Sequence, residues 1–239
     1  MLDLKMISQE AEDKGNMRTK KMYMSKGAVE PLFGNTISSL KPIAKKLLKQ
    51  SNRQDIAMEL YDTGNYDLMY LAGMIVDPLN MTKEDFNKWL DQAYFFMISD
   101  YIVAVSLSET SFAMELADEW IQSDKELVVS AGYATYCWLI GSQPDSIFLK
   151  DNMFNMLRTV QETIHTMPNR IKYSMYNYVY TLGISYLPLH KEAVETAKLI
   201  GKVTVLDKTN KEHIHNPSLD IEKAIEKGRI GFKRKYVRC

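Results

Sequence analysis

Apolar side chains recur at helical spacing along most of the chain, and this periodicity restricts the fold more than any other feature. Each periodic segment places its apolar residues on one face of a helix. The clearest sets are Leu68, Leu71, Ala72, Ile75 and Val76; Phe86, Trp89, Leu90, Ala93 and Tyr94; and Met153, Leu157, Val160 and Ile164. Helix breakers are scarce, with 11 Gly and 7 Pro in 239 residues. The sequence therefore predicts an all-α protein.

Cap residues mark where these helices begin and end. Thr82, followed by Asp85, is typical of an N-terminal cap, and Pro168 and Pro188 suit helix starts. Helix ends are expected at Gly15, Gly27, Gly64, Gly141, Gly201 and Gly228. Only residues 202–206 resemble a β-strand, and we expect this run to be too short to build a sheet.

A series of short amphipathic helices can form an irregular globule or a solenoid of antiparallel helix pairs. No repeat of fixed period is visible, so periodicity alone leaves both arrangements open. No low-complexity linker divides the chain. We therefore assign residues 1–239 to one domain, whose last part, residues 227–239, is a basic C-terminal tail.

The sequence favours a reduced, cytoplasmic protein. Cys137 lies in an apolar helical run and Cys239 is the last residue, which does not suggest a disulfide framework. Residues 1–14 carry charges throughout and lack the apolar centre of a signal peptide. The longest charge-free run, residues 127–144, contains Ser, Gly, Thr and Gln, so it predicts a buried core helix rather than a membrane span.

Charge is distributed unevenly although the net charge is zero. Residues 14–53 hold ten Lys or Arg and a single acid, Glu30, while residues 227–238 hold six bases and no acid. Lys41, Lys45 and Lys49 recur every four residues and share one helical face. The sequence between the two basic ends is acidic, a layout that favours a polyanionic partner.

Asp100 is the only charged residue between positions 92 and 108. A helix that starts near Ser99 would place it on one face with Val103, Ala104 and Leu107. A carboxylate among apolar residues is costly to bury unless it has a partner or a task, which makes Asp100 a catalytic candidate. The alternative is structural, because an Asp in a first helical turn satisfies free backbone N–H groups.

Two further groups suit nucleic acid. The tail segment 228–238 interleaves glycines, aromatics and cations, which suits phosphate binding, although a solvated basic tail fits equally. Tyr173, Tyr176 and Tyr180 share a helical face that opens with Arg170 and Lys172, so they predict either a nucleic-acid groove or a core stripe. Neither a complete metal-ligand set nor a nucleotide-binding glycine motif is present, so no cofactor and no metal are expected.

Several segments resemble one family. Residues 57–64 (AMELYDTG), 71–78 (LAGMIVDP) and 81–89 (MTKEDFNKW) are similar to the bacterial DNA alkylation repair family, the HEAT-like repeat alkylpurine DNA glycosylases. The ending, residues 201–203 and 228–239, is similar to a divergent branch of that family. The resemblance implies a C-shaped α-solenoid of HEAT-like helix pairs whose basic concave surface holds double-stranded DNA. We expect the protein to be a monomer.

The resemblance also implies an activity and a set of site residues. Active members hydrolyse the N-glycosidic bond of cationic purines such as 3-methyladenine and 7-methylguanine. Asp100 matches the acid that stabilises the developing sugar cation, and Phe96 and Tyr178 fall where active members carry Trp. The remaining expected DNA-binding residues are the cations Arg170, Lys172, Arg229, Lys233, Arg234, Lys235 and Arg238.

Departures from the family pattern keep two alternatives open. Smaller aromatics replace both Trp residues, and Ser130 and Ala131 stand where the family has basic residues. We place the glycosylase first because Asp100 is present. The first alternative is a non-catalytic DNA-binding paralogue that recognises DNA by shape and charge. The second is a helical scaffold that binds protein.

Overall fold

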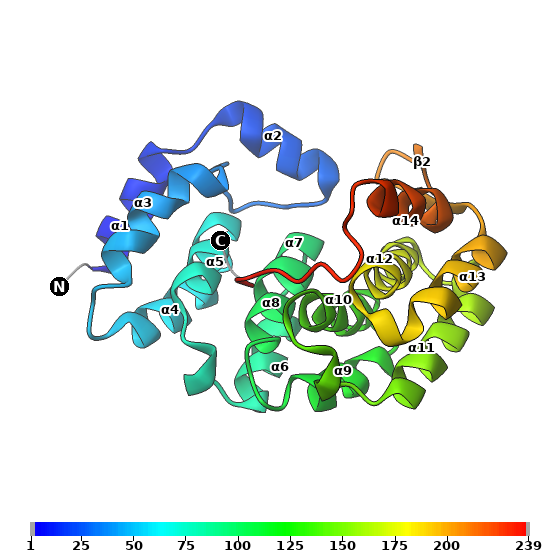
Figure 1. Ribbon diagram of the computed structural model, residues 1–239. Helices are drawn as coiled ribbons and strands as arrows, with labels where there is room; N and C mark the ends of the chain where they lie inside the picture. The colour runs from blue at the N-terminus through cyan, green and yellow to red at the C-terminus, as the bar shows by residue number, and fades with distance from the viewer. Residues whose placement is uncertain (1–2, 238–239) are drawn as a thin grey trace. The chain divides into compact units, whose positions relative to one another are not determined.

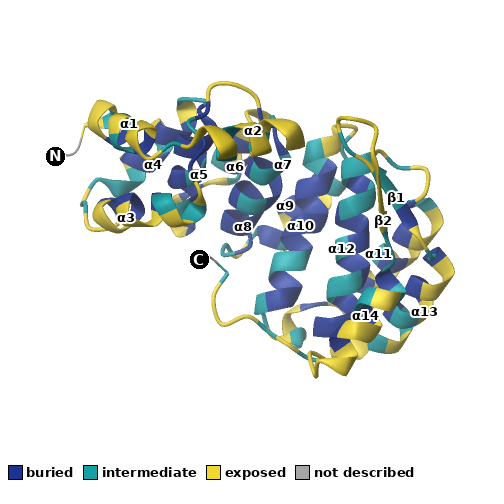
Figure 2. Cartoon of the chain, turned by 90° about the horizontal axis from the view of Figure 1, so that it is seen from above, coloured by how far each residue is buried: buried dark blue, intermediate teal, exposed yellow. Residues whose placement is uncertain are grey.

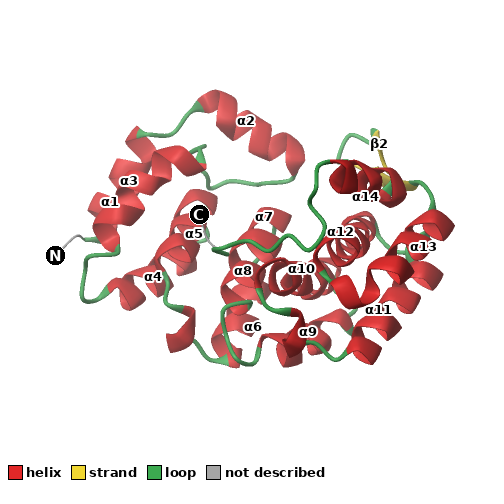
Figure 3. Ribbon diagram, in the orientation of Figure 1, coloured by secondary structure: helices red, strands yellow, loops and turns green. Residues whose placement is uncertain are grey.

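The computed structural model describes residues 3–237, and helices dominate it (Figures 1 and 3). The prediction of an all-α fold is therefore confirmed. None of the helices in the described part combines the length and hydropathy that a membrane span requires. The chain divides into two compact units: unit 1 contains the described residues up to Phe112, and unit 2 runs from Ala113 to Val237.

Unit 1 is built from short helices, of which α4 and α5 pack closely together while α1 and α3 contact α5. Its elements are α1 (Leu4–Asp13), α2 (Met17–Lys26), α3 (Ile37–Leu47), α4 (Arg53–Asp62), α5 (Tyr66–Ile75), η1 (Pro78–Asn80), α6 (Lys83–Asp91), α7 (Phe96–Ile98), η2 (Ser99–Val103) and α8 (Ala104–Leu107). The centre of the unit is aromatic, because the Tyr61 and Trp89 rings stack 4.0 Å apart at an interplanar angle of 1°.

A buried carboxylate ties the loop before α3 to α5. Asp67 is fully buried, and its oxygens accept hydrogen bonds from the backbone N–H groups of Phe33, Gly34 and Asn35, at 2.5, 3.0 and 2.7 Å. Three successive N–H donors around one anion form a compact anion-binding turn. Because Asp67 belongs to α5, these hydrogen bonds fix residues 33–35 on that helix.

Unit 2 is arranged around two long helices, α10 and α12. Its elements are α9 (Ala113–Ile121), α10 (Glu126–Ser142), η3 (Asp145–Ile147), α11 (Lys150–Thr163), α12 (Asn169–Ser185), η4 (Leu187–Leu189), α13 (His190–Ile200), β1 (Val203–Leu206), β2 (Glu212–His215) and α14 (Pro217–Glu226). Figure 2 shows α10 and α12 largely buried, whereas α13 and α14 carry exposed residues. The core helix predicted for residues 127–144 is confirmed as α10.

Most of the predicted helix boundaries are found in the structure. Thr82 caps α6 in a reciprocal capping box with Asp85. Gly27, Gly64 and Gly201 each follow a helix with positive φ angles of 121°, 68° and 65°, a conformation that glycine adopts without a Cβ clash.

The β structure exceeds the prediction. Residues 203–206 form a strand as expected, but β1 pairs antiparallel with β2, from Val203 opposite His215 to Leu206 opposite Glu212. The expectation that no sheet could form was wrong, because β2 (EHIH) lacks the alternating apolar pattern of a half-buried strand. The turn is organised by Asp207, and hydrogen bonds from Thr209 and the His213 ring hold the pKa of its carboxyl well below the usual value.

Two glycines of α10 give opposite predictions for the same substitution. A Cβ on Gly132 would lie 2.9 Å from the Ala117 carbonyl oxygen and 2.7 Å from Ile121 Cγ1, because α9 passes closely here. A Cβ on Gly141 would meet nothing within 4 Å.

We expect Gly132→Ala to lower the free energy of unfolding by about 1–3 kcal/mol, since the backbone of α9 must shift. Gly141→Ala should raise it by about 0.5–1 kcal/mol, because Ala is the better helix former. Urea denaturation of both variants measures this difference. Equal effects would show that α9 does not pack this closely on α10.

Candidate nucleic-acid interface

Asp100 lies in a π-helical stretch of unit 1. The helical backbone begins at Phe96, continues as η2 (Ser99–Val103) and ends with α8. Asp100 is 2% exposed, and its Oδ1 accepts a hydrogen bond from Ser99 Oγ at 2.7 Å. The predicted apolar neighbours Val103, Ala104 and Leu107 are buried as well. The structure thus confirms an apolar setting for this carboxylate and leaves it almost no exposed surface.

Phe96 belongs to an aromatic cluster one turn before Asp100. It is half-buried, and its ring lies 4.7 Å from that of Phe95 and 6.5 Å from that of Tyr101. Phe95 in turn contacts Tyr66 of α5 at 5.5 Å. Phe96 therefore packs against unit 1 and keeps part of its ring accessible, which is compatible with the predicted contact to DNA.

Tyr178 is a core residue, and this corrects its predicted contact with DNA. Its side chain is fully buried, and its hydroxyl donates a hydrogen bond to the Met153 carbonyl oxygen at 3.0 Å. Its ring packs edge-on against Tyr133 and Tyr136 of α10. Tyr178 has no surface for a ligand, because α12 turns this face toward α10 and α11.

Arg170 and Lys172 lie in the first turn of α12 and are both half-buried. The Arg170 backbone N–H donates to Glu126 Oε1 at 2.7 Å, and its Nε donates to the buried Ser130 Oγ at 3.2 Å. The guanidinium also lies 4.7 Å from the centre of the Tyr173 ring. Ser130 therefore helps to hold Arg170 in place.

The tail residues 227–237, called here the basic segment, are anchored to unit 2. The Gly231 N–H donates to the Ile184 carbonyl oxygen at 2.7 Å, and the Arg234 N–H to that of Gly141 at 2.6 Å. Lys233 Nζ donates to the Ile140 carbonyl oxygen at 2.6 Å and lies 2.8 Å from Asp145 Oδ1. Lys233 was predicted to bind DNA, but in this structure its charge is used to fix the segment.

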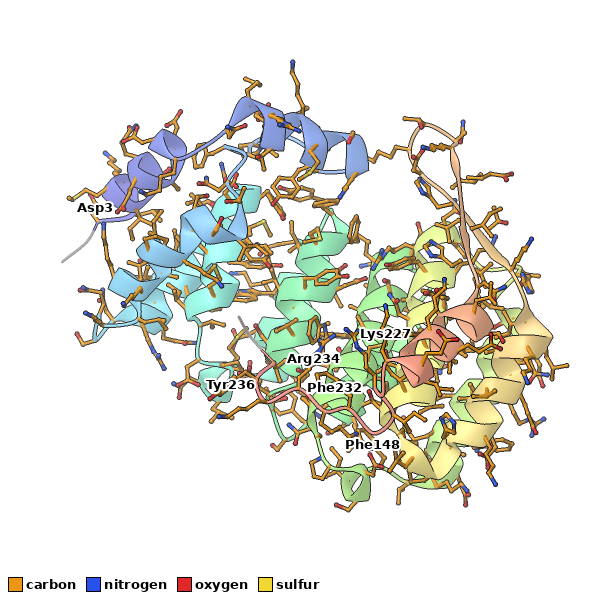
Figure 4. The ribbon with its side chains drawn as sticks, turned by 45° about the horizontal axis from the view of Figure 1, so that its top comes forward. Asp3, Phe148, Lys227, Phe232, Arg234 and Tyr236 are labelled. Carbon is orange, nitrogen blue, oxygen red and sulfur yellow. The ribbon has the colours of Figure 1, made fainter. Side chains whose placement is uncertain are left out.

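Other cations of the basic segment keep their charged groups at the surface. Arg229, Arg234 and Lys235 are exposed, and the Arg234 guanidinium lies 4.5 Å from the centre of the Trp138 ring. Figure 4 labels Arg234 together with Lys227, Phe232 and Tyr236 along this part of the chain. Arg238, also predicted to bind DNA, lies outside the described residues.

A pocket of about 350 Å³ opens beside the start of the basic segment. The Tyr stripe of α12 forms one wall, together with His215 of β2, while α14 and the basic segment form the other. The lining residues are Tyr173, Tyr176, Asn177, Tyr180, His215, Asp220, Lys223, Ala224, Lys227 and Arg229. The sequence predicted either a groove or a core stripe for the three tyrosines. It did not predict that His215 and Asp220 lie beside them, because only the fold brings these residues together.

Lysines at the N-terminal end are also exposed. Lys41 and Lys45 are exposed on α3, as their spacing predicted, whereas α3 ends at Leu47 and Lys49 lies beyond it. Lys46 pairs with Glu10, and the half-buried Lys20 pairs with Glu30, both at 2.7 Å. These lysines belong to unit 1 and the basic segment to unit 2. Their convergence on one DNA molecule therefore stays a prediction. No cluster of three or more metal-binding side chains occurs among residues 3–237.

Comparison with known proteins agrees with this arrangement. A solved structure described as a new family of proteins related to the HEAT-like repeat DNA glycosylases, with affinity for branched DNA structures, superposes with a TM-score of 0.93. It is 50% identical in sequence, and the match covers 99% of this chain and 100% of that one. The HEAT-like fold predicted from the sequence is thereby confirmed.

Two bacterial proteins and one family pattern match the sequence over most of its length. An uncharacterised protein of Listeria innocua is 31% identical over 215 residues, which is 88% of this chain and 92% of the relative. One from Listeria monocytogenes is 31% identical over 209 residues, which is 86% and 89%. The sequence pattern of the DNA alkylation repair enzymes matches residues 5–227. The chain therefore belongs to the DNA alkylation repair enzyme family.

Proposed function

We propose that this protein binds branched DNA without cleaving a glycosidic bond. The observation that carries the proposal is the anchored basic segment. Its backbone and Lys233 are fixed on unit 2, while Arg229, Arg234 and Lys235 present their charges to solvent. Cations held on a rigid support lose less conformational entropy when they contact phosphates than cations on a loose tail.

The comparison supports branched DNA as the partner. The solved relative with 50% identity is described as having affinity for branched DNA structures. Where duplex arms meet, phosphates from several strands come close together, so a compact set of cations can contact more than one strand. Binding of this kind depends on shape and charge rather than on sequence.

The burial of Asp100 supports binding rather than catalysis. Stabilising a sugar cation requires a carboxylate close to the reacting sugar. At 2% exposure, Asp100 offers almost no surface for such a contact. This favours a non-catalytic DNA-binding paralogue over a glycosylase.

We expect the double variant Arg229→Ala/Lys235→Ala to bind a four-way DNA junction at least about tenfold more weakly at low salt. The slope of log K against log salt should become shallower by about 1.8, because each lost phosphate contact removes about 0.9. Fluorescence anisotropy at several salt concentrations measures both quantities.

Lys191→Ala/Lys198→Ala is the matched control, since it also removes two exposed cations, both on α13, an element that does not line the pocket. It should leave both quantities unchanged. An equal loss in the control would mean that total charge, and not the basic segment, determines binding. No junction binding by the unmodified protein would reject the proposal and favour the protein-binding scaffold.

One observation favours the glycosylase as a second candidate. Asp100 lies in a π-helical stretch, and such stretches occur often at functional sites. If this site is catalytic, Asp100→Asn should reduce the release of methylated purine at least about tenfold while DNA binding persists.

The two candidates are separated by a base-release assay on methylated duplex DNA, with a known glycosylase as the positive control. We expect the unmodified protein to release no methylated purine above the Asp100→Asn background. Release that depends on Asp100 would instead establish the enzyme and show that the site opens during the reaction.

A further inference from the structure

The pocket between α12, α14 and the basic segment has a wall built from aromatic rings. Tyr176 and Tyr180 lie nearly parallel, with ring centres 6.5 Å apart and an interplanar angle of 17°. The His215 ring lies 4.9 Å from Tyr176 and 5.0 Å from Tyr173. Flat rings on one wall of a pocket are suited to stacking against another flat ring.

This wall is held in place from the opposite side of the pocket. The Tyr176 hydroxyl donates a hydrogen bond to Asp220 Oδ2 at 2.8 Å, which links α12 to α14. Burial and this hydrogen bond raise the pKa of Tyr176, so the hydroxyl keeps its proton and remains a donor. Burial lowers the pKa of His215, although nearby Asp220 opposes the shift, and this favours the neutral ring.

Three cations line the pocket near the end of α14: Lys223, Lys227 and Arg229. Lys223 lies 3.4 Å from Asp220 Oδ1, whereas Lys227 and Arg229 form no ion pair with any carboxylate of residues 3–237. The turn at Gly228, where the Arg229 N–H donates to the Ala224 carbonyl oxygen at 3.0 Å, leads from α14 into the basic segment. Asp220 is the one carboxylate among the described lining residues.

We propose that this pocket binds one unpaired nucleotide of a branched DNA, with the base against the tyrosine–histidine wall and the flanking phosphates on Lys227 and Arg229. The proposal rests on the proposed function and specifies which part of the DNA is recognised. The pocket volume of about 350 Å³ falls in the range of small-ligand sites. Stacking on aromatic rings tolerates every base, so no sequence preference is expected.

Two DNA junctions that differ by one nucleotide test this assignment. The first is a fully paired four-way junction, and the second carries one unpaired 2-aminopurine nucleotide at the branch point. We expect the second to bind at least about fivefold more tightly, which corresponds to stacking of one base. The 2-aminopurine fluorescence should be quenched on binding.

Tyr180→Ala removes one half-buried ring from the wall, and Tyr180→Phe preserves it. Tyr180→Ala should abolish the preference and the quenching while its affinity for the paired junction is unchanged, whereas Tyr180→Phe should keep both. Circular dichroism and thermal unfolding check that the variants are folded. Equal affinity of the unmodified protein for both junctions would overturn the pocket assignment but leave the proposed function intact.

A competition experiment distinguishes a DNA ligand from a free nucleotide. Deoxyadenosine monophosphate at millimolar concentration should not displace the junction that carries the unpaired nucleotide, because binding of the arms adds to binding of the base. If the free nucleotide quenches tyrosine fluorescence in a Tyr180-dependent way and neither junction shows quenching, the pocket is a site for free nucleotides and the proposal fails.

Discussion

The burial of Tyr178 determines what unit 2 presents to a ligand. Its ring fills the space beside Tyr133 and Tyr136, and its hydroxyl satisfies the Met153 carbonyl oxygen. Removing this ring would leave a large cavity in the core, so the rotation of α12 about its axis is strongly determined. With that rotation set, helical geometry places Tyr173 and Tyr180 at the pocket, where the Tyr176 hydroxyl reaches Asp220 of α14.

The cations of the basic segment perform two different tasks. Lys233 is partly buried, because it forms an ion pair with Asp145 and a hydrogen bond to the Ile140 carbonyl oxygen. Arg229 and Lys235 remain exposed and gain a defined position from that anchor. A net charge near zero conceals this division, since recognition of a polyanion depends on where accessible charge lies and not on its sum.

Asp100 is a catalytic candidate by its position in the sequence, but the structure leaves its carboxylate almost inaccessible to a ligand. The resemblance to the family predicts a catalytic acid at this position, yet Asp100 is buried among apolar neighbours and accepts a hydrogen bond from Ser99. A carboxylate at this position does not by itself establish catalysis, because one fold can carry different functions. The surface for which we propose DNA binding lies instead on unit 2, in the basic segment and the aromatic pocket.

The sequence by itself determined the helices, the Thr82 cap, the glycine helix ends and α10 as a core helix, because these features depend on local periodicity and backbone chemistry. Tertiary structure decided the rest. The resemblance to the family predicted that Tyr178 contacts DNA, but neighbouring helices enclose it. Strand β2 exists because β1 supplies its hydrogen bonds, and Lys233 is an anchor because Asp145 lies beside it. His215 and Asp220 join the tyrosines only through packing, since the contacts between them are long-range and no local pattern encodes them.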